Sequence, residues 1–164
     1  MTIRKEQADD AGRIREMTEL AFRTCPHACG REQDIVDDLR RAGALSLSLV
    51  AVDAGEVVGH VALSPVTIPD ARGAWFGLGP ISVLPRLQRT GIGGALMKAA
   101  LAWLRDEEAA GCVLVGDPQY YVRFGFTSDP SLTVPGIPPE VTLAIRLRPG
   151  EDRGLIRFHP AFGC

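Results

Sequence analysis

The chain has 164 residues, of which 46% are hydrophobic and 23% charged, a length and balance that suit one domain with a full core. Its formal net charge of -2 and the lack of a Lys/Arg run argue against a nucleic-acid partner, and no apolar run approaches the ~20 residues that cross a bilayer. Because the first residues also lack an apolar leader, we expect a single cytoplasmic domain over residues 1–164, with no membrane partner.

The first quarter of the chain predicts strand, helix, loop and helix. Residues 2–5 suit a short strand, and Asp9 and Asp10 offer capping groups to a helix that runs to about Phe22. A loop over 24–31 leads to a second helix that ends near Gly43.

The middle of the chain predicts strands. Residues 47–52 and 57–63 are apolar and flank a turn at 53–56, which predicts an antiparallel hairpin. A further strand is expected over 74–83. Its Gly and Pro residues indicate a bulge or the close approach of a ligand.

The longest predicted helix covers residues 91–107 and is followed by a short buried strand at 111–115. One or two helical turns are expected at 120–124, and 129–140 should be irregular because of its prolines. Late strands are expected at 141–147 and 155–158. This order predicts an α/β sheet domain with helices on both faces.

Four cysteines, Cys25, Cys29, Cys112 and Cys164, are irregularly spaced, which predicts free thiols in a reducing compartment. Two of them flank His27 in a Cys-Pro-His-Ala-Cys stretch. A zinc site takes four ligands, and no second cluster follows, so we expect no metal. Cys112 reads as a small apolar core residue.

The turn that ends in Gly91, Gly93 and Gly94 is the most informative segment. It lies between a strand and the long helix, where backbone N–H groups point outward and glycines let a phosphate approach. Arg86 and Arg89 can add positive charge at its rim. A Walker A loop is excluded because no Gly-Lys-Ser/Thr follows, and the third glycine of a dinucleotide fingerprint is missing. A glycine-rich turn that merely packs the helix on the sheet stays open as the alternative.

The same segment resembles motif A of the GNAT family of N-acetyltransferases, whose Gln/Arg-x-x-Gly-x-Gly/Ala core is matched by Gln88, Gly91 and Gly93. The preceding strand, residues 79–85, also fits. The resemblance implies acetyl-CoA as cosubstrate, with backbone groups of the strand pairing with its pantetheine arm and the turn holding its pyrophosphate. The implied cofactor-binding residues are Ile81, Ser82, Val83, Gln88, Arg89, Thr90, Gly91, Ile92, Gly93 and Gly94.

Residues 113–126, with their Gly-Asp-Pro-Gln-Tyr-Tyr-Val-Arg-Phe-Gly-Phe run, resemble motif B of the family and in particular its YhbS-like sub-group. Segments 34–40, 57–65 and 158–162 fit the sub-group as well, so the likeness covers nearly the whole chain. It implies the GNAT fold, a mostly antiparallel mixed sheet with a central, splayed pair of parallel strands.

By resemblance, Tyr121 is the residue that protonates the leaving thiolate, with Tyr120 as the alternative. A phenol with a pKa of about 10 can act as a general acid. Three roles stay open for Arg123: it pairs with Asp117, it lies near the cofactor, or it is a plain surface charge. The general base also stays open among four candidates: His60, Glu32, Asp117 and Ser82.

The leading interpretation is therefore an acetyl-CoA-dependent N-acetyltransferase that acts on a primary amine of a small molecule or peptide. The alternatives are an acyl-CoA sensor without catalysis and, far behind, a small kinase. Variable loops at 24–33, 65–73 and 128–140 are expected to form the acceptor pocket. A homodimer is compatible with the family.

Overall fold

The computed structural model describes residues 1–26 and 28–163. The described chain forms two compact units. The first comprises Met1–Ser64, Gly79–Ala100 and Pro160–Cys164, and the second comprises Pro65–Leu78 and Leu101–His159. The expectation of one domain over residues 1–164 stays a prediction.

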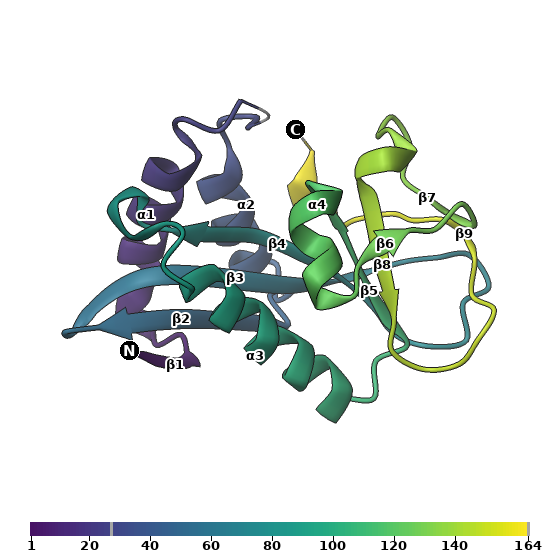
Figure 1. The fold of residues 1–164 in the computed structure, drawn as a ribbon, viewed down its shortest axis with the longest axis horizontal. Helices are drawn as coiled ribbons and strands as arrows, with labels where there is room; N and C mark the ends of the chain where they lie inside the picture. Colours follow the sequence, from purple (N-terminus) through teal and green to yellow (C-terminus); the bar gives the residue numbers. More distant parts are fainter. Residues whose placement is uncertain (27, 164) are drawn as a thin grey trace. The chain divides into compact units, whose positions relative to one another are not determined.

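The first unit is built on a mostly antiparallel sheet (Figure 1). Strand β1 (Thr2–Lys5) pairs antiparallel with β2 (Leu47–Asp53), and β2 pairs antiparallel with β3 (Glu56–Val66) across a tight turn. This confirms the predicted hairpin. Strand β4 (Trp75–Val83) follows β3 in the order, and the N–H of Leu84 donates to the carbonyl of Val58 at 2.9 Å.

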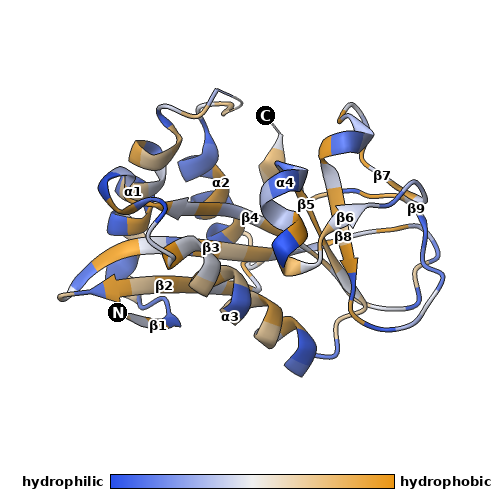
Figure 2. Cartoon of the chain, viewed as in Figure 1, coloured by the Kyte–Doolittle hydropathy of each residue, from blue (hydrophilic) through white to orange (hydrophobic). Residues whose placement is uncertain are grey.

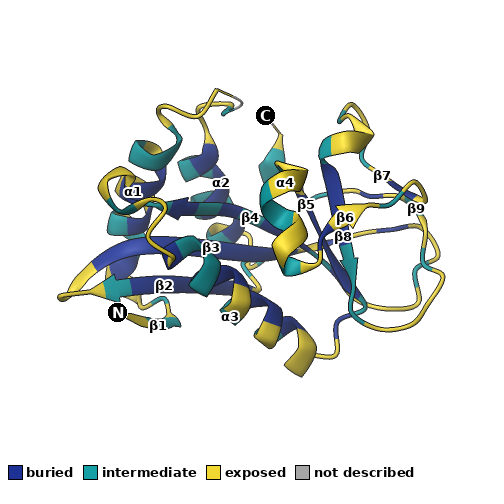
Figure 3. Cartoon of the chain, viewed as in Figure 1, coloured by how far each residue is buried: buried dark blue, intermediate teal, exposed yellow. Residues whose placement is uncertain are grey.

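Helices cover both faces of this sheet. Helices α1 (Ala11–Phe22) and α2 (Glu32–Arg41) pack against each other on one face. The first turns of α3 (Ile92–Asp106) lie on the other face, where Gly59 allows a close approach. A Cβ on Gly59 would lie 2.9 Å from Cγ2 of Ile92 and 3.0 Å from Cδ1 of Leu96, so a larger residue would force these side chains to move. Figures 2 and 3 show the result: β2 and β3 are hydrophobic and buried between the two helical layers.

The residue before α1 acts differently from the prediction. The Asp10 side chain does not cap α1. It closes the 3-10 turn Ala8–Asp10 instead, where its carboxylate accepts from the N–H of Gln7 at 2.7 Å and from the guanidinium of Arg4 at 2.7 Å. Asp10 therefore ties the start of α1 to β1.

The second unit contains a parallel strand pair. Residues Trp75–Gly77 of β4 pair parallel with Gly111–Val113 of β5 (Gly111–Val115), at the boundaries predicted for β5. Strand β5 pairs antiparallel with β8 (Thr142–Arg146), and β8 pairs antiparallel with β6 (Thr127–Ser128). The sheet is thus mostly antiparallel with one parallel pair, as the fold prediction required.

Two short strands, β7 (Leu132–Thr133) and β9 (Gly154–Leu155), form a separate parallel pair. The strand expected over 155–158 is therefore shorter than predicted. The segment 129–140 is mainly irregular but contributes β7 and the start of the 3-10 turn Pro139–Val141.

The core of the second unit gathers around Trp75, whose indole N–H donates to Oδ2 of Asp152 at 2.9 Å. The same carboxylate accepts from the backbone N–H of Arg72 at 2.8 Å, so it fixes the connection that leads into β4. The other buried members are Val66, Ile68, Val113, Leu132, Ala144 and Ile156.

Among the described cysteines, Cys25 and Cys112 are free, as predicted, whereas Cys29 is part of a disulfide, so the prediction of a free thiol there is wrong. His27 and Cys164 lie outside the described residues. No helix in the described ranges is long and apolar enough to span a membrane.

Candidate functional site

The predicted phosphate turn lies in the first unit, between β4 and α3. Pro85–Leu87 form a 3-10 turn, and the backbone then reverses through Arg89, with a φ of +64°, and Gly91, with a φ of +96°. The N–H of Ala95 donates to the carbonyl of Gly91 at 3.0 Å, which is the first bond of α3. The N–H groups of residues 92–94 precede that bond and have no carbonyl partner within the helix.

Gly91 lies beside open space at the start of α3. Its positive φ is costly for any other residue, and a Cβ built on it would meet nothing within 4 Å. Two side-chain hydrogen bonds hold the loop. Nε2 of Gln88 donates to the carbonyl of Val83 at 3.2 Å, and Oγ1 of Thr90 donates to the carbonyl of Leu87 at 2.5 Å. An anion can therefore reach the positive end of the α3 dipole.

The two arginines predicted at the rim differ. Arg86 forms an ion pair with Glu56 at 2.9 Å, so its charge is compensated. Arg89 is exposed within the turn itself. Of the two, Arg89 is the better placed to add charge to an anion at the start of α3.

A pocket of about 280 Å³ opens at the end of β4. It brings together four of the predicted residues and the end of α1 with the following loop. Its lining residues are Ala21, Phe22, Thr24, Cys25, Ile81, Ser82, Val83 and Gln88. Thr24 and Cys25 belong to the loop predicted to contact the acceptor, whereas the part played by α1 was not predicted.

The second unit carries the other motif. The carboxylate of Asp117 accepts from the N–H of Gln119 at 2.9 Å and so caps the short helix α4 (Pro118–Tyr121). A 3-10 turn, Val122–Phe124, follows and ends at Gly125, whose φ is +96°. The predicted helical turns at 120–124 are therefore present, and they begin two residues earlier.

The rings of Tyr120 and Tyr121 meet edge to face, with centroids 4.9 Å apart and an interplanar angle of 85°. Arg123 lies over the Tyr120 ring, 4.6 Å from its centroid, and its Nε donates to the Tyr120 carbonyl at 2.9 Å. Arg123 thus contacts Tyr120, while Asp117 serves as the cap. The Tyr121 ring lies beside Gly116 and packs edge to face with Phe126 at 6.3 Å.

Three of the four candidate bases make contacts with neighbouring groups. Glu32 accepts from the N–H of Cys29 at 2.8 Å, so it organises the loop before α2. Asp117 caps α4, and the hydroxyl of Ser82 lies 3.4 Å from that of Thr18.

The fourth candidate, His60, is completely buried, and burial lowers its pKa to about 4, so the ring is neutral near pH 7. The thiol of Cys112 is also buried, and burial raises its pKa, which leaves it without a thiolate to act as a nucleophile.

The chain resembles known acetyltransferases over most of its length. Residues 14–126 match the model of the acetyltransferase (GNAT) family. An uncharacterised N-acetyltransferase of Escherichia coli K12, YhbS, is 36% identical over 127 residues, which cover 77% of this chain and 73% of that protein.

Two solved structures share the fold. A GNAT family acetyltransferase of Brucella melitensis, in complex with acetyl-CoA, is 46% identical, with a TM-score of 0.87, and the match covers 98% of this chain and 97% of that one. E. coli YhbS in complex with CoA is 32% identical, with a TM-score of 0.90, and the match covers 99% and 92%. These relatives confirm the resemblance seen in the sequence, and the chain belongs to the GNAT family of acetyltransferases.

Proposed function

We propose that the chain transfers an acetyl group from acetyl-CoA to a primary amine. The observation that carries the proposal is the start of α3. There the N–H groups of residues 92–94 and the open space at Gly91 form an anion site within the family motif. Two relatives of the same fold bind acetyl-CoA and CoA, which supports the same ligand here.

The residues at this turn suit a pyrophosphate. The main chain supplies its donors, so binding needs no side chain of particular identity beyond the glycines, and Arg89 adds a cation. We infer that the pantetheine arm pairs with the backbone of Ile81 and Val83. The pocket at the end of β4 then receives the acceptor amine, because it is lined by these same residues and by the loop after α1.

The chemistry needs little from the protein. A thioester is already activated, so holding the amine beside it supplies much of the rate, and a backbone N–H near Val83 can polarise the carbonyl. The thiolate leaves more readily when it is protonated, and we assign this role to Tyr121 rather than Tyr120. Support for this choice comes from the place of Tyr121 in the family motif, four residues before Gly125.

The test is turnover with a panel of amines: phenethylamine, spermidine, a lysine-containing peptide and a peptide with a free N-terminus. Release of CoA is followed as free thiol. The proposal predicts thiol release that depends on both acetyl-CoA and an amine. Saturable binding of acetyl-CoA without turnover on any amine would instead favour the acyl-CoA sensor.

A further inference from the structure

A row of polar side chains, all buried except the partly exposed Glu6, crosses the sheet of the first unit on the side that α1 and α2 cover. Glu6 directly follows β1, Ser48 lies on β2, His60 on β3 and Ser82 on β4. Ser48, His60 and Ser82 are all buried. A buried polar group is normally kept only where hydrogen bonds satisfy it, so the contacts along the row show what each member does.

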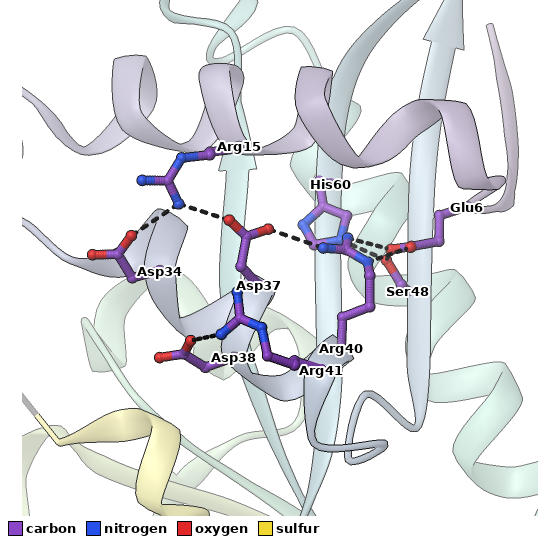
Figure 4. Close-up of polar contacts among 9 residues, drawn as sticks. All are labelled: Glu6, Arg15, Asp34, Asp37, Asp38, Arg40, Arg41, Ser48 and His60. Atoms are coloured by element: carbon purple, nitrogen blue, oxygen red, sulfur yellow. Dashed lines mark hydrogen bonds and ion pairs between the residues drawn. The ribbon is translucent and has the colours of Figure 1, made fainter.

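The outer part of the row is a chain of hydrogen bonds (Figure 4). The Ser48 hydroxyl lies 2.7 Å from Nε2 of His60 and also bonds to Oε1 of Glu6. A hydroxyl has a single proton, and a carboxylate can only accept, so Ser48 donates to Glu6 and accepts from His60. The proton of neutral His60 is therefore on Nε2, which leaves Nδ1 as a bare acceptor.

Glu6 is held as a carboxylate. Arg40 of α2 donates to both of its oxygens, at 2.8 Å and 3.0 Å. Burial alone raises the pKa of Glu6, but the bonds from Arg40 and Ser48 outweigh it and lower that pKa overall. Behind this pair, Asp37 of α2 binds Arg40 at 3.0 Å and Arg15 of α1 at 2.6 Å. Glu6 and Arg40 are the charged groups that act on His60.

The inner end of the row is the Nδ1 atom of His60. Nδ1 of His60 is buried, and no described residue bonds to it. The bond from the N–H of Leu84 to the carbonyl of Val58 indicates an antiparallel pairing just beyond the end of β4. If the same register continues for two residues along each strand, Ser82 stands opposite His60 in the sheet, although its hydroxyl makes no hydrogen bond to Nδ1. Ser82 also faces this layer, because its hydroxyl contacts Thr18 of α1.

Each end of the row opens into a pocket of the first unit. Ser82 lines the pocket of about 280 Å³ at the end of β4. Glu6, Arg40 and Ser48 line a second pocket of about 320 Å³ on the outer edge of the sheet. A path of exchangeable protons thus connects the pocket assigned to the acceptor with a solvent-facing carboxylate.

We propose that this row is a proton relay that deprotonates the acceptor ammonium, an inference that depends on the proposed acetyltransferase function. The ammonium gives its proton to the Ser82 hydroxyl, and Ser82 passes its own proton to Nδ1 of His60 through one buried water. His60 releases its Nε2 proton to Ser48, and Ser48 releases its proton to Glu6. Glu6 then loses the proton to solvent. After the product leaves, the Nδ1 proton passes back through Ser82 to water in the pocket, and a proton from solvent returns to Nε2 through Glu6 and Ser48, which restores the row. His60 acts through Ser82 and does not touch the amine.

The tautomer is tested first, without any substrate. Nitrogen-15 NMR of the imidazole rings in the whole protein should show His60 protonated on Nε2 and bare on Nδ1, with no titration from about pH 5 to pH 9. A proton on Nδ1 would overturn the relay, because Nδ1 then has no lone pair with which to accept.

Turnover tests the relay itself. In Ser48→Ala the link to Glu6 is lost, and in His60→Gln a hydrogen bond to Ser48 is retained without a group that can pass a proton. Both variants should lose about 10- to 100-fold in kcat/KM at pH 7. The loss should shrink to within about threefold at pH 10, where the free amine needs no base. Ser48→Thr keeps the hydroxyl and should restore the rate, and if His60→Gln fails to fold, the two Ser48 variants decide the matter.

A merely structural role gives a different pattern. An equal loss at every pH, or wild-type rates in both variants, would overturn the relay while leaving the acetyltransferase activity in place. If the wild type itself releases no thiol with any amine of the panel, the proposed function fails, and the relay fails with it.

Discussion

The burial of His60 predicts how the stability of the protein depends on pH. Its pKa is lowered from 6.5 to about 4 in the folded protein, chiefly by burial. Between these values the unfolded chain takes up a proton at this ring and the folded protein does not. The contribution of His60 to stability is therefore complete above pH 6.5 and is lost as the pH falls toward 4.

The size of the effect follows from the two pKa values. One pKa unit corresponds to about 1.4 kcal/mol, so moving from pH 7.5 to pH 5 should lower the free energy of unfolding by about 2 kcal/mol through His60 alone. His60→Gln removes this dependence, because an amide does not titrate. Carboxylates with lowered pKa values, such as Asp10 and Asp129, add their own acid sensitivity but are common to both proteins.

The assay is urea unfolding of the wild type and of His60→Gln at both pH values, followed by circular dichroism. The variant is expected to be less stable at pH 7.5, and the comparison is the change with pH in each protein. The wild type should lose about 2 kcal/mol more than the variant on acidification. Equal losses would mean that His60 is not held neutral by burial, and the reasoning on its protonation would be wrong.

Three further changes test the ligand and the proton donor. Gly91→Glu should abolish CoA binding. Gly91→Ala shares the backbone strain without the charge, so it should bind CoA more weakly than the wild type but measurably. Equal CoA affinities of the two variants would show that the pyrophosphate does not bind at this turn. Tyr121→Phe should lower turnover by about 10- to 1000-fold with little change in CoA affinity, and Tyr120→Phe should not. In Gly116→Ala the new Cβ would lie 2.5 Å from the Tyr121 ring and displace it, so turnover should fall as in Tyr121→Phe. Normal turnover in Gly116→Ala would argue against a tyrosine held in a fixed position.

Local patterns predicted the regular elements well. The apolar stripe and glycines gave the helix found at Ile92–Asp106 to within one residue at each end, and the short run Gly111–Val115 was identified without error. Such elements are set by periodicity and turn residues, which a single sequence displays. Short strands such as β6 and β7 have two residues each, and only pairing with distant partners defines them.

One part of the candidate site could be predicted from local sequence and another part could not. The glycine turn was visible because its geometry depends on neighbouring residues, whereas the relay was not. Ser48, His60 and Ser82 lie on three strands, and only the register between the strands places them in one row. A single buried histidine in a strand is more often structural, and nothing local to His60 indicates the serines on either side or the carboxylate of Glu6.

Calorimetric titration of the purified protein with acetyl-CoA, with CoA and ATP as comparisons, tests the central claim most directly. The anion site at the start of α3 predicts saturable binding of acetyl-CoA and CoA at about micromolar concentrations, and none of ATP over the same range. If neither acetyl-CoA nor CoA gives a heat of binding, the glycine turn only packs α3 on the sheet. The proposed acetyltransfer would then lose its basis.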